Sequence, residues 1–119
     1  MHRVLVVEDE PLIRLTIIDA LEDAGFDVVE ASNADEAVRI IDGQTIHFLF
    51  TDIQMPGQSS GVDLAHAVAE RFPEAGIIVA SGRMRPEDID LPVGAHFFAK
   101  PYSFVDVVKQ LNAWTGQNL

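Results

Sequence analysis

The chain contains no cysteine among its 119 residues, so disulfide bonds and thiolate metal sites are excluded. Basic residues are also few. Eight lysines and arginines stand against 19 aspartates and glutamates, which gives a net charge of −11. Because so acidic a chain repels the phosphate backbone, we expect no direct binding of nucleic acid. The same acidity suits a protein that holds a divalent cation or meets basic partners.

Long apolar runs are absent as well. None approaches the roughly 20 residues needed to cross a bilayer, so we expect no membrane span. The sequence runs from Met1 directly into a strand pattern without a signal-peptide pattern, and we expect a cytoplasmic location. Hydrophobic residues make up 48% of the chain, which predicts a packed core. A length of 119 residues fits one domain, residues 1–119.

Five short apolar runs predict β-strands, and the third is the most informative. Residues 48–51 (FLFT) show no polar alternation, which predicts a strand buried on both faces. Asp52 follows directly, and Pro56 and Gly57 then form a turn. Asp52 should therefore lie at the carboxyl end of a buried strand, where open α/β sheets bind ligands. A turn-capping role is the alternative for such an aspartate. The other predicted strands are residues 3–7, 27–31, 77–80 and 95–99.

Helical patterns alternate with these strands. In the first of them, Ile13, Ile17 and Leu21 recur at helical spacing and should face the core. Between the fourth and fifth strands, Pro86 and Pro92 leave room for barely one helical turn, so a fourth helix there should be short or irregular. The other helices are expected to begin near Pro11, Asn33, Ser60 and Ser103.

This alternation predicts an α/β fold. We expect a flavodoxin-like, doubly wound, five-stranded parallel sheet of order 2-1-3-4-5 with helices on both faces. All strands then end at one edge of the sheet. That edge would gather the polar side chains of Glu8, Asp9, Asp52, Ser81 and Lys100.

Carboxylates brought together in this way require a counter-charge. Two of them roughly 4–5 Å apart repel by about 3–4 kcal/mol at an effective dielectric constant of about 20. The candidate ligands are hard oxygens, so the expected ion is Mg²⁺, with waters completing its octahedron. A metal held by carboxylates beside a lysine and a hydroxyl suits phosphoryl transfer, in which an aspartate can act as the nucleophile.

Four segments together resemble the receiver domains (CheY-like) of two-component response regulators. They are residues 6–11 (VVEDEP), residues 51–57 (TDIQMPG), Ser81-Gly82 and Lys100-Pro101, in the family's order and at matching strand ends. The resemblance covers nearly the whole chain. It implies a phosphoacceptor of a two-component or phosphorelay system rather than an enzyme, with self-catalysed phosphotransfer and slow autodephosphorylation. The implied partners are a histidine kinase or histidine phosphotransfer protein and a downstream protein target.

The resemblance also implies how the acidic residues act. Asp52 would accept a phosphoryl group from a phosphohistidine and would contribute to the metal site. Asp9 would bind Mg²⁺ directly, Glu8 through a water molecule, and Gln54 through its backbone carbonyl.

Three further residues have implied roles in signalling. Lys100 would pair with the phosphoryl oxygens, and Ser81 would hydrogen-bond one of them once Asp52 is modified. Phe97 matches the family's switch aromatic, and the Lys100–Pro101 peptide bond matches one that is cis in the family. Taken alone, Lys100 fits a solvated strand-end charge, Ser81 a turn cap and Phe97 a core residue.

The sequence departs from the family pattern in three places. Glu8 stands where aspartate is commoner, and the loop at 56–61 is one residue longer than usual. Residues 81–100 are short and interrupted by prolines where the family has its fourth helix. This last departure concerns the output face that the fourth helix helps to form in the family.

Three other functions are compatible with parts of the pattern. A hydrolase of the haloacid-dehalogenase type needs an acid two residues after its nucleophile, where this chain has Gln54. A flavodoxin-like cofactor binder needs a phosphate loop after the first strand, where residues 8–10 (EDE) would repel phosphate. A pseudo-receiver usually lacks one of the acids, the hydroxyl or the lysine, all of which are present here. The four histidines are scattered and fit surface or satisfied positions.

Overall fold

The computed structural model describes residues 2–53 and 60–116, in which five strands form one parallel sheet. The strand order is β2-β1-β3-β4-β5, so the predicted 2-1-3-4-5 sheet is confirmed. The turn expected at Pro56 and Gly57 lies outside the described residues. The strands are β1 Arg3–Val7, β2 Asp27–Ala31, β3 Phe48–Asp52, β4 Gly76–Ser81 and β5 His96–Ala99.

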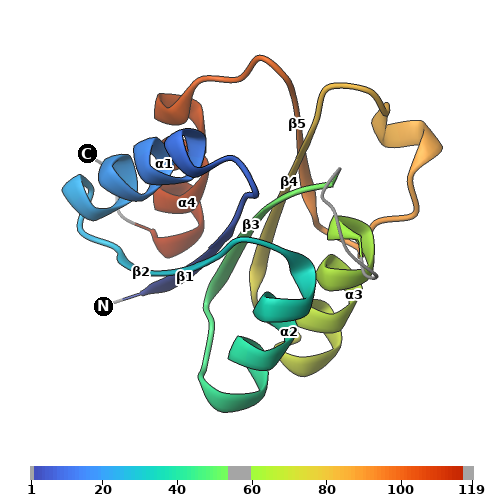
Figure 1. The fold of residues 1–119 in the computed structure, drawn as a ribbon, viewed down its shortest axis with the longest axis horizontal. Helices are drawn as coiled ribbons and strands as arrows, with labels where there is room; N and C mark the ends of the chain where they lie inside the picture. Colours follow the sequence, from blue (N-terminus) through green and yellow to red (C-terminus); the bar gives the residue numbers. More distant parts are fainter. Residues whose placement is uncertain (1, 54–59, 117–119) are drawn as a thin grey trace.

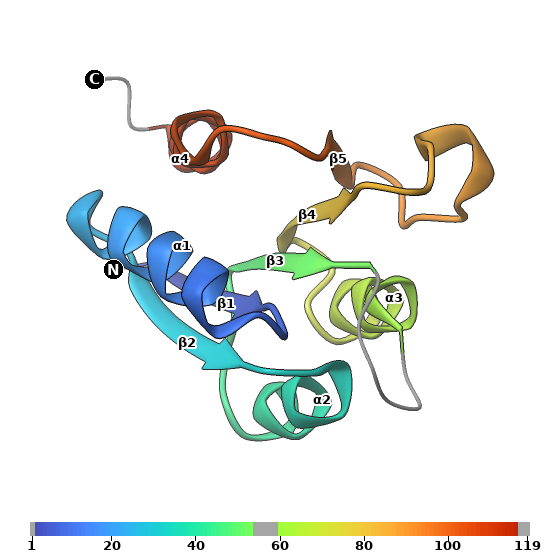
Figure 2. The same cartoon turned by 45° about the horizontal axis from the view of Figure 1, so that its top comes forward.

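Helices cover both faces of the sheet, as Figures 1 and 2 show. One pair, α1 and α4, lies on one face, and α2 and α3 lie on the other. No helix within residues 2–53 and 60–116 is long and apolar enough to cross a membrane. The helices are α1 Pro11–Asp23, α2 Ala34–Gly43, α3 Gly61–Arg71 and α4 Phe104–Thr115.

Side-chain caps explain where three of these helices begin. The Asn33 side chain accepts the backbone N–H of Glu36 at 2.8 Å, at the start of α2. At the start of α3, Ser60 and Asp63 form a complete capping box. Ser103 caps α4, while α1 has proline in its first turn and no side-chain cap. These start positions confirm the sequence predictions.

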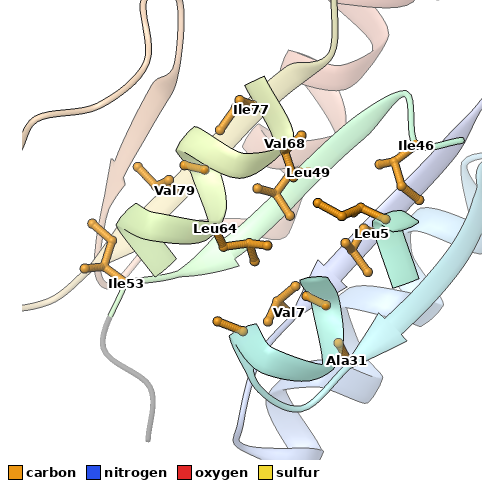
Figure 3. Packing of buried hydrophobic residues seen from close by; sticks show 14 residues of the cluster. Leu5, Val7, Ala31, Ile46, Leu49, Ile53, Leu64, Val68, Ile77 and Val79 are labelled. Carbon is orange, nitrogen blue, oxygen red and sulfur yellow. The ribbon is translucent and has the colours of Figure 1, made fainter. Parts of the chain in front are cut away.

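The strands alternate their side chains between two apolar cores. Leu5, Leu49 and Val79 face α2 and α3, as Figure 3 shows, whereas Phe50 and Ile78 belong to the core under α1 and α4. This alternation explains why β3 is buried along its whole length. It also decides which helix layer lies beside each residue at the carboxyl edge.

The prediction that Ile13 faces the core is wrong. Ile13 is 39% exposed, whereas Ile17, Ile18 and Leu21 form the buried stripe of α1. The helix begins beyond the tip of β1, so its first turns have little sheet beneath them to cover Ile13. Helical spacing identified the stripe but not the point along the helix at which its burial begins.

The connection from β4 to β5 contains no α-helix. Its only helical element is a single 3₁₀ turn, η1, at Pro86–Asp88, which confirms the short and irregular fourth helix. Ile89 and Leu91 pack against the core under α3, and His66 of α3 donates from Nε2 to the carbonyl oxygen of Asp90 at 2.7 Å. These contacts hold the second half of the connection to the body of the molecule.

Candidate functional site

Asp52 is the last residue of the central strand β3 and is only 4% exposed. Hydrogen bonds hold the backbone at Asp52: the Thr51 hydroxyl donates from Oγ1 to the Asp52 carbonyl oxygen at 2.9 Å, and the Ile53 N–H donates to the Ala80 carbonyl oxygen at 3.0 Å. Strand pairing places Asp52 opposite Ala80 of β4. The prediction that Asp52 ends a buried strand is therefore confirmed.

Glu8 and Asp9 meet Asp52 at this edge. One carboxylate oxygen from each of the three residues lies within 4.8 Å of the others. Glu8 follows β1 directly and is buried, whereas Asp9 is exposed. Gln54, the fourth residue that the sequence suggested for the metal site, lies outside the described residues.

Burial and the neighbouring acids change the pKa of Glu8. Its burial raises its pKa from the ordinary 4.5 to about 7, and the hydrogen bond with Asp9 and the negative charge of Asp52 add to the rise. The backbone N–H of Glu10, 3.4 Å from Glu8 Oε2, and the charge of Lys100 act in the opposite direction. Near neutral pH the cluster therefore favours an added positive charge, either a proton on Glu8 or a cation.

Lys100 supplies one positive charge to the site. Its Nζ donates to Asp52 Oδ2 at 2.5 Å, although 48 residues separate the two in sequence. The Lys100 backbone is held in place because its N–H donates to the carbonyl oxygen of Ser81 at 3.0 Å. The peptide bond to Pro101 is cis, as the resemblance implied. Lys100 is thus an ion-pair partner of Asp52 rather than a solvated charge.

Ser81 is buried at the end of β4, one residue beyond the partner of Asp52. Its hydroxyl oxygen accepts the backbone N–H groups of Arg83 at 3.2 Å and Met84 at 3.0 Å. Ser81 therefore has the capping role considered for it and also lies at the site edge. Its side chain holds the start of the β4–β5 connection beside the strand end that carries the site.

Phe97 is half-buried in β5, where it pairs with Val79 and packs against the core under α2 and α3. In this structure it is a core residue two strands away from Asp52. The β4–β5 connection therefore begins at the site edge, after Ser81, and ends at the opposite edge of the sheet, before β5.

Comparison with known proteins decides the family. The model described as "Response regulator receiver domain" matches residues 4–112. The chain belongs to this family. Receiver domains are the phosphoacceptor modules of two-component systems, so the phosphoacceptor function predicted from the sequence is confirmed at the level of the family. This assignment favours a receiver over the hydrolase and the cofactor binder.

Several relatives of this receiver domain differ in length. It is 31% identical over 115 residues to the response regulator receiver protein CpdR of Brucella abortus, covering 93% of this chain and 94% of CpdR. It is 36% identical over 115 residues to the transcriptional regulatory protein AruR of Pseudomonas aeruginosa, covering 92% of this chain but 44% of AruR. The chain thus spans less than half of AruR.

Solved structures confirm the receiver fold. A response regulator receiver domain from Clostridium thermocellum has a TM-score of 0.84 and 26% identity, covering 98% of this chain and 96% of that one. The response regulator TrrA from Thermotoga maritima, in complex with Mg²⁺ and BeF, also has a TM-score of 0.84 and 26% identity. That match covers 96% of this chain and 99% of TrrA.

Two residues of this receiver site were missed by sequence reasoning. A Cβ on Gly61 would lie 2.2 Å from the carbonyl oxygen of Asp52, so only glycine lets α3 begin this close to the site. The ring of Tyr102 lies 5.6 Å from that of Phe50 and packs against the core under α1 and α4. Burial raises the Tyr102 pKa, and the charges of Glu8 and Asp52 raise it further. The sequence signals were weak: a loop glycine, and a tyrosine two residues after Lys100.

Proposed function

We propose that Asp52 is the phosphoacceptor of this receiver domain. Its donor is a phosphohistidine on a histidine kinase or a histidine phosphotransfer protein. The observation that carries the proposal is the ion pair between Lys100 Nζ and Asp52 Oδ2 inside the acid cluster. A buried carboxylate held in this way at a strand end is oriented and charge-compensated for attack on phosphorus.

In the proposed transfer, a carboxylate oxygen of Asp52 bonds to phosphorus while the bond from phosphorus to the donor imidazole breaks. The imidazole nitrogen leaves with the electron pair of that bond. Lys100 then pairs with the phosphoryl oxygens, and Ser81 donates a hydrogen bond to one of them. The domain thus promotes its own phosphorylation and loses the group slowly to water, as a signalling protein rather than an enzyme with a released substrate.

The residues present fit a Mg²⁺ ion. All the candidate side-chain ligands are carboxylates within 4.8 Å, and the raised pKa of Glu8 reflects negative charge that a cation would offset. Asp9 and Asp52 would bind directly, Glu8 through water, and Gln54 through its carbonyl oxygen. When bound, Mg²⁺ supplies positive charge for the transferring phosphoryl oxygens. The complex of TrrA with Mg²⁺ and BeF supports this assignment by similarity.

The donor protein is proposed to dock on apolar side chains beside the site. Leu12 and Leu15 of α1 are exposed, as is Val105 in the first turn of α4. Both helices begin just after strand ends that carry site residues, so these side chains flank the acid cluster. The downstream target would instead bind the region whose conformation depends on Ser81 and Phe97. We place this signalling unit, residues 1–119, in the cytoplasm.

Labelling with acetyl phosphate and Mg²⁺ tests the assignment of Asp52. We expect wild type to gain one base-labile phosphoryl group, measured by intact mass, and Asp52→Asn to gain none. Asp42→Asn removes an exposed acid from the end of α2 and should label like wild type. Full labelling of the Asp52→Asn variant at another carboxylate would show that the assignment is wrong.

A further inference from the structure

A second concave surface lies at the opposite edge of the sheet, where the strands begin. It is a hollow of about 820 Å³, lined by residues just before or at the start of β1, β3, β4 and β5 and by Trp114 near the end of α4. This volume lies within the range of small-molecule sites, roughly 300–1,000 Å³. None of its lining residues belongs to the phosphorylation site.

Flat rings form one wall of the hollow. The rings of Phe48 and Trp114 stack with centroids 6.0 Å apart and planes at 12°. Gly76 permits this arrangement, because a Cβ there would lie 2.4 Å from the Trp114 ring. His2 extends the aromatic surface, with its ring 5.6 Å from Phe48. Such a wall suits a flat apolar body that can stack against it.

The polar groups of the hollow are mostly donors. His47 Nδ1 accepts the backbone N–H of Arg3 at 2.9 Å, so the proton of the neutral ring is on Nε2, which acts as a donor. The Arg71 guanidinium lies over the Phe72 ring, 5.5 Å from its centroid, and adds a fixed positive charge. Glu74 is the one acid in the lining, on a chain whose net charge is −11. The charges of Arg71 and Glu74 offset each other, so the lining is close to neutral and repels an anion less than the rest of the chain does.

We propose that this hollow binds a planar aromatic anion. The flat body would pack against the partly exposed Trp114 ring, which itself stacks on the buried ring of Phe48, and its carboxylate or sulfonate would be held by the donors of Arg71 and His47. This function is separate from phosphoryl transfer, because the two sites lie at opposite ends of the same strands.

Trp114 makes the proposal directly measurable, because it is the only tryptophan in the chain. Anilinonaphthalene sulfonate, a planar aromatic anion, serves as the probe, and its neutral analogue phenylnaphthylamine serves as the matched compound. We expect the anion to bind with one-to-one stoichiometry and to quench Trp114 emission by energy transfer. Backbone amide shifts should change at residues 45–48, 71–77 and 93–95. The neutral analogue should bind about fivefold more weakly.

Charge-removing variants test the role of Arg71. Arg71→Gln should weaken binding of the anion about fivefold and leave the neutral analogue unchanged within twofold. Arg39→Gln removes the same charge from an exposed position on α2 outside the hollow and should bind both compounds like wild type. Both arginines are exposed, so neither variant should unfold the domain. Amide shifts centred elsewhere, or equal loss of affinity in the two variants, would overturn the proposal.

Discussion

Three carboxylates and one ammonium group meet at the carboxyl edge of the sheet. Lys100 compensates Asp52 directly, whereas Glu8 shares a hydrogen bond with Asp9. Glu8 is buried and Asp9 is exposed, so water screens Asp9 while the pKa of Glu8 rises to about 7. A single residue thus carries most of the unfavourable electrostatics of the site.

Removing the Asp9 charge should have opposite effects on stability and on metal binding. Without metal, Asp9→Asn should melt about 3 °C higher than wild type, because one like charge leaves the cluster. The same variant should bind Mg²⁺ at least about tenfold more weakly, because a carboxylate ligand is lost. Melting curves with and without Mg²⁺ measure both effects. Glu10→Gln, one residue away, is the control, and a metal-free Asp9→Asn protein that melts lower than wild type would contradict this electrostatic account.

The elements were largely predictable because each has a local cause. The apolar run at residues 48–51 predicted β3, and Ser60 predicted the start of α3. The carboxyl-edge grouping of Glu8, Asp52 and Lys100 followed from the parallel topology, because parallel strands end at one edge.

Other features depend on contacts between segments that are distant in sequence, which local patterns do not contain. Gly61 is required by the approach of α3 to Asp52, and the aromatic wall of Phe48 and Trp114 joins β3 to α4. The exposure of Ile13 depends on where α1 lies relative to the tip of β1. Periodicity predicts a helical face, but only the packed structure shows which part of that face is covered.

The turn after β4 should respond to phosphorylation through Ser81. A Ser81 hydroxyl drawn toward a phosphoryl group weakens its bonds to the N–H groups of Arg83 and Met84. We expect beryllofluoride and Mg²⁺ to shift the backbone amides of residues 81–86, residues 95–101 and the start of α4. In Ser81→Ala the shift at Phe97 should fall by at least about half, because the hydroxyl link is lost. Shifts confined to Glu8, Asp9 and Asp52, or undiminished at Phe97 in the variant, would contradict this coupling.

For the molecule as a whole, the raised pKa of Glu8 makes stability depend on pH. The folded state holds the Glu8 proton up to about pH 7, whereas the unfolded chain releases it near pH 4.5. Between these values the folded state binds more protons, so the free energy of unfolding falls as pH rises. The contribution of Glu8 is present below about pH 4.5 and is lost above about pH 7.

Glu8→Gln isolates this contribution, because glutamine resembles the protonated side chain. Without metal, the variant should exceed wild type in unfolding free energy by up to about 3 kcal/mol at pH 8. The difference should shrink toward zero as the pH falls below about 4.5. Urea unfolding at several pH values measures it, and Asp42→Asn, an exposed acid, should follow the wild-type curve. Parallel curves for wild type and Glu8→Gln would contradict the prediction.

The helix-free connection between β4 and β5 also bears on how the molecule opens. The other consecutive strands are joined by α1, α2 or α3, whose apolar stripes must leave a core before their strands can separate. The β4–β5 connection holds one 3₁₀ turn and few buried side chains, so its detachment exposes less apolar surface. Its amide hydrogens should exchange with solvent earlier than those of β1 and β3. The least cooperative part of the fold therefore starts at Ser81, so local unfolding begins beside the residue that we expect to respond to phosphorylation.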